Sequence, residues 1–304
     1  MRNELRRWLN GKFVRSPAQS FFEWRSGRRL VVLAYHDVKD AERLFDQIRF
    51  IKSCTRPVDQ LDVIRALRGR QLPRFPILIT FDDGCRSLVD TVLPMFHEHG
   101  IPGVAFVVSG LLGTDRSLWW SEVERLVSAG GSSDVIGRVT ASDAVSLLKY
   151  LPEEQRVSAI QDLRSSAQAE MRGQQLSHDE LSKLESGGIA IGSHTHNHPC
   201  LPRCSTEKVQ AEIREAHHQL ASALGHPPRA FAYPNGDWDP RAESLLKQLG
   251  YDAAFLFDHR TNRLPIRDPL RISRVRVDST TSMDRFRMIV SGLHPTLHRL
   301  RGGK

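Results

Sequence analysis

The chain has 304 residues, of which 40% are hydrophobic and 26% charged, a composition typical of a soluble globular protein with a full core. No apolar stretch reaches the roughly 18 residues that a membrane span requires. The basic start is not followed by an apolar segment and a cleavage site, so no secretory signal is predicted and we expect a cytoplasmic protein. The four cysteines lack the paired spacing of a disulfide framework, which indicates free thiols.

Positive charge is concentrated at the two ends of the chain. Residues 1–29 carry a net charge of +6 and residues 285–304 a net charge of +5. Since the whole chain carries +8, the segment 30–284 must carry −3. A nucleic-acid groove would place positive charge on the folded body, so we expect no nucleic-acid partner. The basic ends suit an anionic membrane surface; the alternative is that they are solvated tails.

The N-terminal segment also carries an apolar pattern. Its apolar residues recur at helical spacing and are followed by aromatic residues: Leu5, Trp8, Leu9, Phe13, Phe21, Phe22 and Trp24. This pattern predicts either an interfacial anchor or a helix that packs on the rest of the protein.

Apolar runs of strand length alternate with helical stretches along the chain. The predicted strands are Leu30–Tyr35, Ile77–Phe81, Gly103–Val108, Ile189–Ser193, Ala230–Tyr233, Ala253–Phe257 and Ile272–Val277. The predicted helices include Ser87–His99, Ser121–Ala129, Glu153–Met171, Ser177–Glu185, Thr206–Leu224 and Pro240–Leu249. Alternation predicts a parallel α/β sheet, and about seven units fit a barrel better than an open sheet. The barrel would occupy residues 30–284, with a helical insertion over its mouth at 109–187.

Polar residues follow several of these strands, at the end where parallel α/β folds gather their sites. Thr80-Phe81-Asp82-Asp83-Gly84 closes the second predicted strand. Two adjacent carboxylates diverge at a strand end, so one can hold a metal while the other stays free as a base. Taken alone, an Asp-Asp-Gly is more typical of a turn. His194 and His198 follow another strand, and with one carboxylate they form the nitrogen and oxygen set of a catalytic zinc site.

Cys200 and Cys204 lie just past these histidines, but no second pair completes a four-ligand structural zinc site.

Together these motifs resemble the polysaccharide deacetylase family, whose catalytic unit is the NodB homology domain (carbohydrate esterase family 4). Its first signature, Thr-Phe-Asp-Asp-Gly, is unchanged at 80–84, and its second, His-Ser/Thr-x-x-His-Pro, is present at 194–199. The resemblance extends over roughly residues 30 to 280 through Ala34-Tyr35-His36-Asp37-Val38, Phe231-Ala232-Tyr233-Pro234-Asn235-Gly236 and Arg271-Ile272-Ser273-Arg274-Val275. The opening Tyr-His strand is similar to that of the poly-N-acetylglucosamine deacetylases.

The resemblance implies a distorted (β/α)7 barrel and the metal-dependent removal of N-acetyl groups from amino sugars. In the family the second Asp of the pair binds the metal. Asp83, His194 and His198 are therefore the expected ligands of one divalent ion, most simply zinc, with cobalt or nickel as substitutes. Asp82 would be the general base that accepts the proton of the attacking water.

Two departures from the family pattern bear on the remaining roles. Many members carry Arg-Pro-Pro-Tyr-Gly where this chain has Ala232-Tyr233-Pro234-Asn235-Gly236. Asn235 keeps a backbone N–H for the oxyanion, but the Arg is lost. Arg274 could come round the barrel to Asp82 or be a surface cation. The late Leu-x-x-His acid motif is also missing; His36 is the candidate acid, the alternative being a histidine that packs in the interior.

Tyr233, Trp119 and Trp120 are the predicted substrate contacts. Because adjacent residues diverge on a helix, at most one of the two tryptophans is expected to stack on a sugar and the other to pack in the core. The expected substrate is an N-acetylated polysaccharide, oligosaccharide or lipid-linked sugar.

Three alternatives use the same residues. The scaffold could hydrolyse another small amide, or the chain could be an inactive carbohydrate-binding protein that has lost the motif Arg. Two His and one carboxylate also serve non-haem iron oxygenases, but those are usually jelly-roll proteins rather than βα repeats.

Overall fold

The computed structural model describes residues 11–167 and 173–300. The predicted N-terminal positions Leu5, Trp8 and Leu9 lie outside these described residues. The helix predicted to reach Met171 ends earlier, at Ser166, because the backbone of Ala167 is extended.

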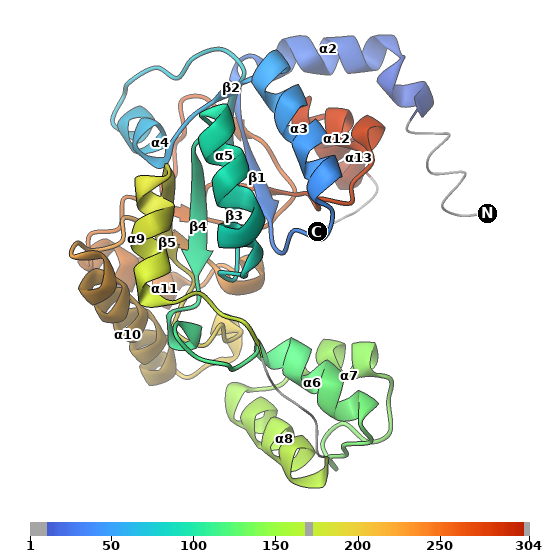
Figure 1. The fold of residues 1–304 in the computed structure, drawn as a ribbon, viewed down its shortest axis with the longest axis vertical. Coiled ribbons are helices and arrows are strands. Elements are labelled where there is room, and N and C mark those ends of the chain that lie inside the picture. Colours follow the sequence, from blue (N-terminus) through green and yellow to red (C-terminus); the bar gives the residue numbers. More distant parts are fainter. Residues whose placement is uncertain (1–10, 168–172, 301–304) are drawn as a thin grey trace.

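The core of the molecule is a curled, mainly parallel sheet surrounded by helices (Figure 1), which confirms the predicted α/β barrel. Its strands follow the order β7-β6-β5-β4-β3-β1-β8, with β2 paired to β3 and β9 paired to β1. The strands are β1 (Arg29–Tyr35), β2 (Arg56–Pro57), β3 (Pro76–Phe81), β4 (Gly103–Val107), β5 (Ile189–Ser193), β6 (Ala230–Ala232), β7 (Ala253–Phe255), β8 (Asn262–Arg263) and β9 (Val275–Arg276). Every residue of β3 is buried, as expected for a strand covered on both faces.

The last predicted strand, 272–277, is divided between the two ends of the sheet. Ile272 forms a parallel bridge to Phe255 in β7, whereas Val275 in β9 pairs with Leu33 in β1. The segment therefore changes partner within three residues, which is why only Val275–Arg276 is a regular strand. By contacting both β7 and β1, it brings the two ends of the curled sheet together into a distorted barrel.

Several helices that flank the barrel begin at a residue whose side chain caps the first turn. Ser205 caps the longest of them, and Gly225 ends it in a left-handed conformation with φ of 77°. The helices around the barrel are α2 (Pro17–Ser26), α3 (Ala41–Cys54), α4 (Gln60–Leu67), α5 (Leu93–His99), α9 (His178–Ser186), α10 (Thr206–Leu224), α11 (Pro240–Gln248), α12 (Met283–Val290) and α13 (Leu293–Leu300). A π-helical turn, Leu88–Val92, precedes α5 in place of the start of the predicted helix. Among the helices of the described chain, none has the length and apolar character to cross a membrane.

Three helices form a separate unit at the carboxyl ends of the strands, α6 (Trp119–Ser128), α7 (Ala141–Leu148) and α8 (Glu153–Ser166), as Figure 1 shows. They have a hydrophobic core of their own, to which Cys200 from the barrel side also contributes. By contrast, α9 packs its Leu181 and Leu184 into the main core beside β5. Helix α2 lies at the opposite end of the barrel from this helical unit (Figure 1).

Candidate active site

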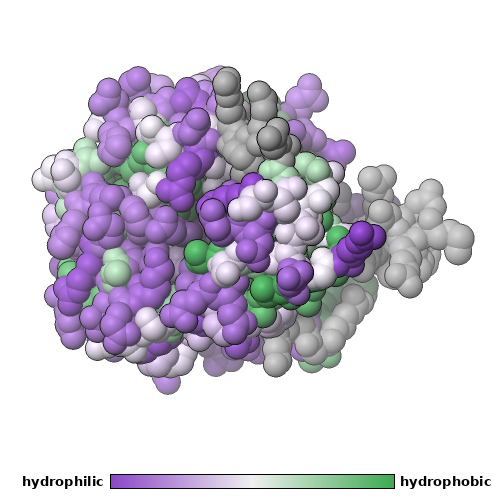
Figure 2. Space-filling view, turned by 90° about the horizontal axis from the view of Figure 1, so that it is seen from below, coloured by the Kyte–Doolittle hydropathy of each residue, from purple (hydrophilic) through white to green (hydrophobic). Residues whose placement is uncertain are grey.

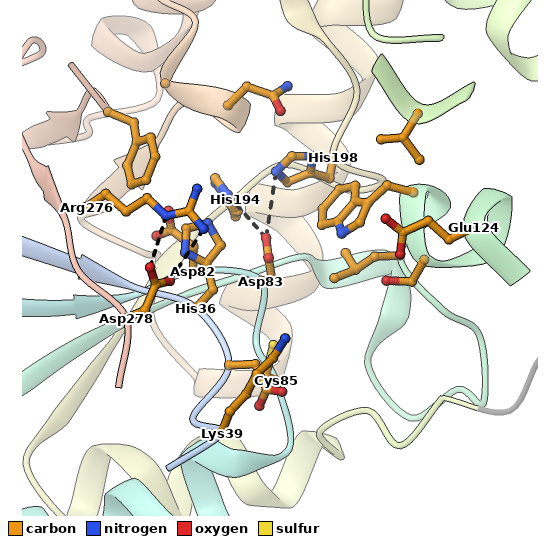
Figure 3. A pocket seen from close by; sticks show the side chains of 18 of the residues that line it. His36, Lys39, Asp82, Asp83, Cys85, Glu124, His194, His198, Arg276 and Asp278 are labelled. Atoms are coloured by element: carbon orange, nitrogen blue, oxygen red, sulfur yellow. Dashed lines mark hydrogen bonds and ion pairs between the residues drawn. The ribbon is translucent and has the colours of Figure 1, made fainter. Parts of the chain in front are cut away.

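A cavity of about 860 Å³ opens at the carboxyl ends of the strands, and the helical unit contributes part of its wall. Strand ends supply Asp82 and Asp83 after β3, His194 after β5 and His36 after β1 (Figure 3). The face of the molecule on this side is mainly hydrophilic, with small hydrophobic areas between the polar residues (Figure 2). The cavity therefore suits a polar ligand of the size of a short sugar chain.

Asp83, His194 and His198 converge at the base of the cavity. Asp83 Oδ1 lies 3.6 Å from His194 Nε2 and 3.7 Å from His198 Nε2, and all three side chains are buried (Figure 3). Ligand atoms around a tetrahedral zinc with bonds of about 2.0–2.1 Å are separated by a little over 3 Å, so small movements would complete such a site. Asp83 Oδ1 has no hydrogen-bond partner among the described residues, which leaves it free for a cation. The group fits a divalent metal.

The backbone at these ligands is held in an unusual conformation. Asp83 and His198 have φ values of 74° and 53°, in the left-handed region that residues other than Gly rarely adopt. Such strain persists only where the surroundings over-determine it, and it concentrates at functional sites. The His198 N–H donates to Thr195 Oγ1 at 3.0 Å, and His194 Nδ1 lies 2.8 Å from the carbonyl oxygen of Ala232. The second contact leaves His194 Nε2 facing Asp83.

Burial controls the protonation of the three residues. It lowers the pKa of His194 to about 4 and that of His198 well below its ordinary value, so both imidazoles are neutral, as metal ligands must be. Burial, followed by the neighbouring charge of Asp82, raises the pKa of Asp83 to about 8. An unpaired carboxylate is unfavourable at this position, and a bound cation would remove the penalty.

Asp82, the other carboxylate of the pair, forms a buried ion pair with Arg274. Arg274 Nη1 donates to Asp82 Oδ1 at 2.6 Å and Nη2 to Oδ2 at 2.8 Å, while its Nε donates to the Leu256 carbonyl at 2.8 Å. Arg274 has no exposed surface, so it is not the surface cation of the alternative hypothesis. Burial alone would raise the pKa of Asp82, but Arg274 outweighs it and holds this pKa at about 2. The carboxylate is therefore ionised and oriented.

His36 and Asn235 both line the cavity, as the sequence predicts for residues at strand ends. The His36 ring meets the Phe257 ring edge-on at 5.6 Å between centroids, and its Nδ1 has no hydrogen-bond partner among the described residues. Burial lowers the pKa of His36, against the opposing effect of Asp82. Asn235 lies in a short turn with φ of 56°.

The predicted substrate contacts separate into one that lines the cavity and two that do not. Trp120 lines the cavity and packs against the His198 ring at 4.6 Å. Trp119 is buried in the core of the helical unit, so the expectation of a sugar contact is wrong for this residue. The Tyr233 side chain is also fully buried, and its hydroxyl donates to the Leu270 carbonyl at 3.1 Å, which corrects the same expectation for Tyr233. Helix divergence explains the first result, and strand alternation explains the second.

Several cavity residues were not among the predicted site residues. They come from the loop after β1, from the helical unit and from the segment after β9, and include Lys39, Glu124, Lys149, Arg276, Asp278 and Thr280. Arg276 Nε lies 3.4 Å from Asp278 Oδ2 (Figure 3). Among them, Asp278 had a signal in the sequence, because it directly follows the predicted strand 272–277 as the recognised motifs follow theirs.

Comparisons with known proteins agree with this geometry. The family model for polysaccharide deacetylase matches residues 69–137 and 147–254. Chitin deacetylase 2 of Saccharomyces cerevisiae is 35% identical over 83 residues, which are 27% of this chain and 26% of that protein. The chain thus spans about a quarter of the length of the curated relatives that it matches.

Solved structures share the fold over nearly the whole chain. The Streptococcus pyogenes deacetylase PplD in complex with acetate superposes with a TM-score of 0.59 at 17% identity, covering 84% of this chain and 94% of that one. IcaB from Ammonifex degensii gives a TM-score of 0.58 at 20% identity, covering 87% and 97%. At sequence identities of 17% and 20%, these similarities show that the fold is shared.

Proposed function

The chain belongs to the polysaccharide deacetylase family, and on that premise we propose that it is a metal-dependent hydrolase that removes N-acetyl groups from amino-sugar residues. The observation that carries the proposal is the pairing of two carboxylates with opposite environments in one cavity. Asp83 faces two neutral histidines, and Asp82 is held by Arg274. Such a division gives adjacent carboxylates different roles.

We propose Asp83, His194 and His198 as the ligands of one zinc ion, with cobalt or nickel as substitutes. When bound, the metal would lower the pKa of a water molecule and polarise the acetyl carbonyl. Asp82 would accept the proton of that water, and Arg274 would fix the orientation of its carboxylate. The backbone N–H of Asn235 would donate to the oxyanion as negative charge develops there.

His36 would donate a proton to the leaving nitrogen. It extends from the end of β1 into the cavity beside Asp82 (Figure 3), and no hydrogen bond within the described protein engages its Nδ1. The amine must be protonated as the carbon–nitrogen bond breaks, so a histidine within the cavity supplies what the missing late motif would have supplied.

The inactive, carbohydrate-binding alternative rested mainly on the lost motif Arg. Arg274, which lies just before β9, contacts Asp82 through two hydrogen bonds, which favours the enzyme. Hydrolysis of another small amide uses the same groups and is an outcome of the test below.

We further propose that the N-terminal region contacts an anionic membrane surface. Phe21 and Trp24 on α2 are 55% and 66% exposed, and basic residues surround them in the sequence. Helix α2 lies at the opposite end of the barrel from the helical unit (Figure 1), and the helical unit lines the cavity, so contact through α2 would leave the cavity facing away from the surface. This arrangement favours a substrate that is reached from solvent.

Mass spectrometry of the purified, zinc-loaded protein incubated with N-acetylated oligosaccharides and glycolipids tests the function. We expect loss of acetyl groups with wild-type protein and none with Asp82→Asn. Hydrolysis of an N-formyl or cyclic amide added to the panel, without loss of acetyl groups, would support the alternative hydrolase, and binding without turnover by wild-type protein would contradict the enzyme.

A further inference from the structure

We propose that Trp119 and Arg156 in the helical unit are positioning residues, which hold the metal-binding loop and the Asn235 turn in place. The inference rests on the proposed function only in taking His198 as a metal ligand. Trp119 Nε1 donates to the backbone carbonyl of His198 at 3.1 Å. The neighbouring Trp120 packs on the His198 ring at 4.6 Å. One helix therefore contacts both the backbone and the side chain of this ligand.

The backbone contact matters because His198 is strained. Its φ of 53° lies in the left-handed region, where a histidine stays only if neighbouring groups hold it. Thr195 Oγ1 accepts from the N–H of His198, and Trp119 satisfies its carbonyl. Both polar backbone groups of the strained residue are thus fixed, one of them by a side chain that lies 79 residues away in sequence.

Arg156 holds Trp119 in turn. Its guanidinium carbon lies 4.5 Å from the centre of the Trp119 ring, and its Nη2 donates to Glu153 Oε1 at 2.6 Å. Arg156 is 3% exposed and does not line the cavity, so it is not placed to bind substrate. Burying a guanidinium is costly unless it is paired and well packed, and here the ion pair and the aromatic face provide both.

The Arg156 guanidinium is also connected to the turn that contains Asn235, because both contact the sulfur of Cys200. Arg156 Nη1 lies 3.6 Å from Cys200 Sγ, and Asn235 Nδ2 lies 3.5 Å from the same sulfur. Cys200 follows the metal loop directly and packs in the core of the helical unit. Arg156 is thereby connected to the carbonyl of His198 on one side and to the Asn235 turn on the other.

Trp119→Phe is the most informative variant, because it keeps an aromatic ring for Arg156 while it removes the N–H donor together with part of the indole ring. Groups that orient metal ligands typically change metal affinity by about 10–100-fold. We expect a zinc Kd at least about 10-fold weaker by chelator competition and an altered absorption spectrum of the cobalt form, beside a loss of thermal stability in the metal-free protein from the smaller ring. A wild-type Kd and cobalt spectrum would overturn the proposal.

Arg156→Met tests the second step, and Arg164→Met is its matched control. Arg164 also pairs with a buried glutamate of the helical unit, Glu122, at 2.8 Å from its Nη2. We expect both variants to lower stability and only Arg156→Met to weaken zinc binding.

If Arg156→Met does not fold, Arg156→Lys keeps the charge and loses the planar packing, and the same loss of zinc affinity is expected. Equal zinc affinities in the Arg156 and Arg164 variants would refute the positioning role. Since no substrate enters these measurements, a failure to detect deacetylation would not affect them.

Discussion

Arg274 and Asp82 are 192 residues apart in sequence, yet two hydrogen bonds of 2.6 and 2.8 Å join them inside the barrel. Arg274 also donates to Thr80 Oγ1 at 3.1 Å, and its guanidinium carbon lies 5.3 Å from the centre of the Phe106 ring. A paired and packed guanidinium of this kind keeps the carboxylate ionised and fixed in one orientation. The pair determines how the site should respond to pH.

Arg274→Lys should move the acid limb of the pH–rate profile to higher pH. The base must be ionised to accept a proton, and Arg274 holds the pKa of Asp82 at about 2, against the effect of burial. A lysine cannot form the two parallel hydrogen bonds, so this pKa should rise toward its ordinary value of 3.8 or above. Measurement of kcat/KM against pH checks the shift. Arg271→Lys, at an ion pair with Glu243 that does not line the cavity, is the control and should leave the acid limb in place.

The same ion pair should contribute to stability over a defined pH range. Because the folded pKa of Asp82 is depressed, its contribution is fully present above the unfolded value of 3.8 and is lost as the pH falls through about 2. Arg274→Met leaves a buried carboxylate unpaired, which typically costs about 3–5 kcal/mol. Urea unfolding at pH 7 should show this loss, and an unchanged midpoint would contradict the structural role of the pair.

Asp82→Asn should abolish most turnover while sparing the metal. An amide cannot accept the proton of the attacking water, and general-base catalysis is typically worth about 10²–10⁴-fold. Asp83→Asn is the contrasting variant. It removes a predicted metal ligand, so its zinc content should fall and its activity should fall with it. Rates and zinc content measured on both proteins would separate the two roles. Loss of zinc from Asp82→Asn, with activity recovered on adding zinc, would reverse the assignment.

His36→Ala should lower kcat without lowering zinc content. As a general acid, His36 must be protonated when it acts, so the rate should fall as pH rises through its pKa. Burial lowers that pKa, so the alkaline limb of the profile of kcat/KM against pH should lie below the ordinary histidine value of 6.5. The limb should disappear from the kcat/KM profile of the variant. A variant with a reduced rate but the same alkaline limb would mean that another group supplies the proton.

The parts of the fold that depend on local patterns could be predicted from the sequence. Seven of the nine strands follow from apolar runs, and several residues at their ends meet in one cavity because parallel strands end at the same face. Arg274 could not be assigned in advance, since its contact with Asp82 exists only once the last strand has closed the barrel. The sequence also could not show which of the two tryptophans is buried, because that depends on the rotation of α6 about its axis. Arg156 had no signal at all, being a basic residue in a polar helix until packing placed it beside Trp119.

Helix α2 presents two aromatic residues, Phe21 and Trp24, to solvent, while two polar residues are buried against the rest of the protein. Its buried residues are Gln19 and Ser26, and Gln19 accepts a hydrogen bond from Ser291 Oγ at 3.3 Å. Phe21 and Trp24 are 55% and 66% exposed, with ring centroids 6.1 Å apart. Packing on the barrel therefore does not account for the two aromatic residues, and exposed aromatic side chains beside cations are typical of interfacial helices.

The double variant Phe21→Ser, Trp24→Ser should sediment less with anionic liposomes than the wild-type protein does. The two rings supply the apolar contact, while the surrounding basic residues supply an attraction that salt screens. Wild-type binding should therefore weaken as salt is added, and deletion of residues 1–29 should remove it. Tyr150→Ser is the matched control, since Tyr150 is an aromatic residue that is 73% exposed on the helical unit at the other end of the molecule. Sedimentation of the double variant at the wild-type level, or equal losses in the double variant and in Tyr150→Ser, would show that α2 is not the contact surface.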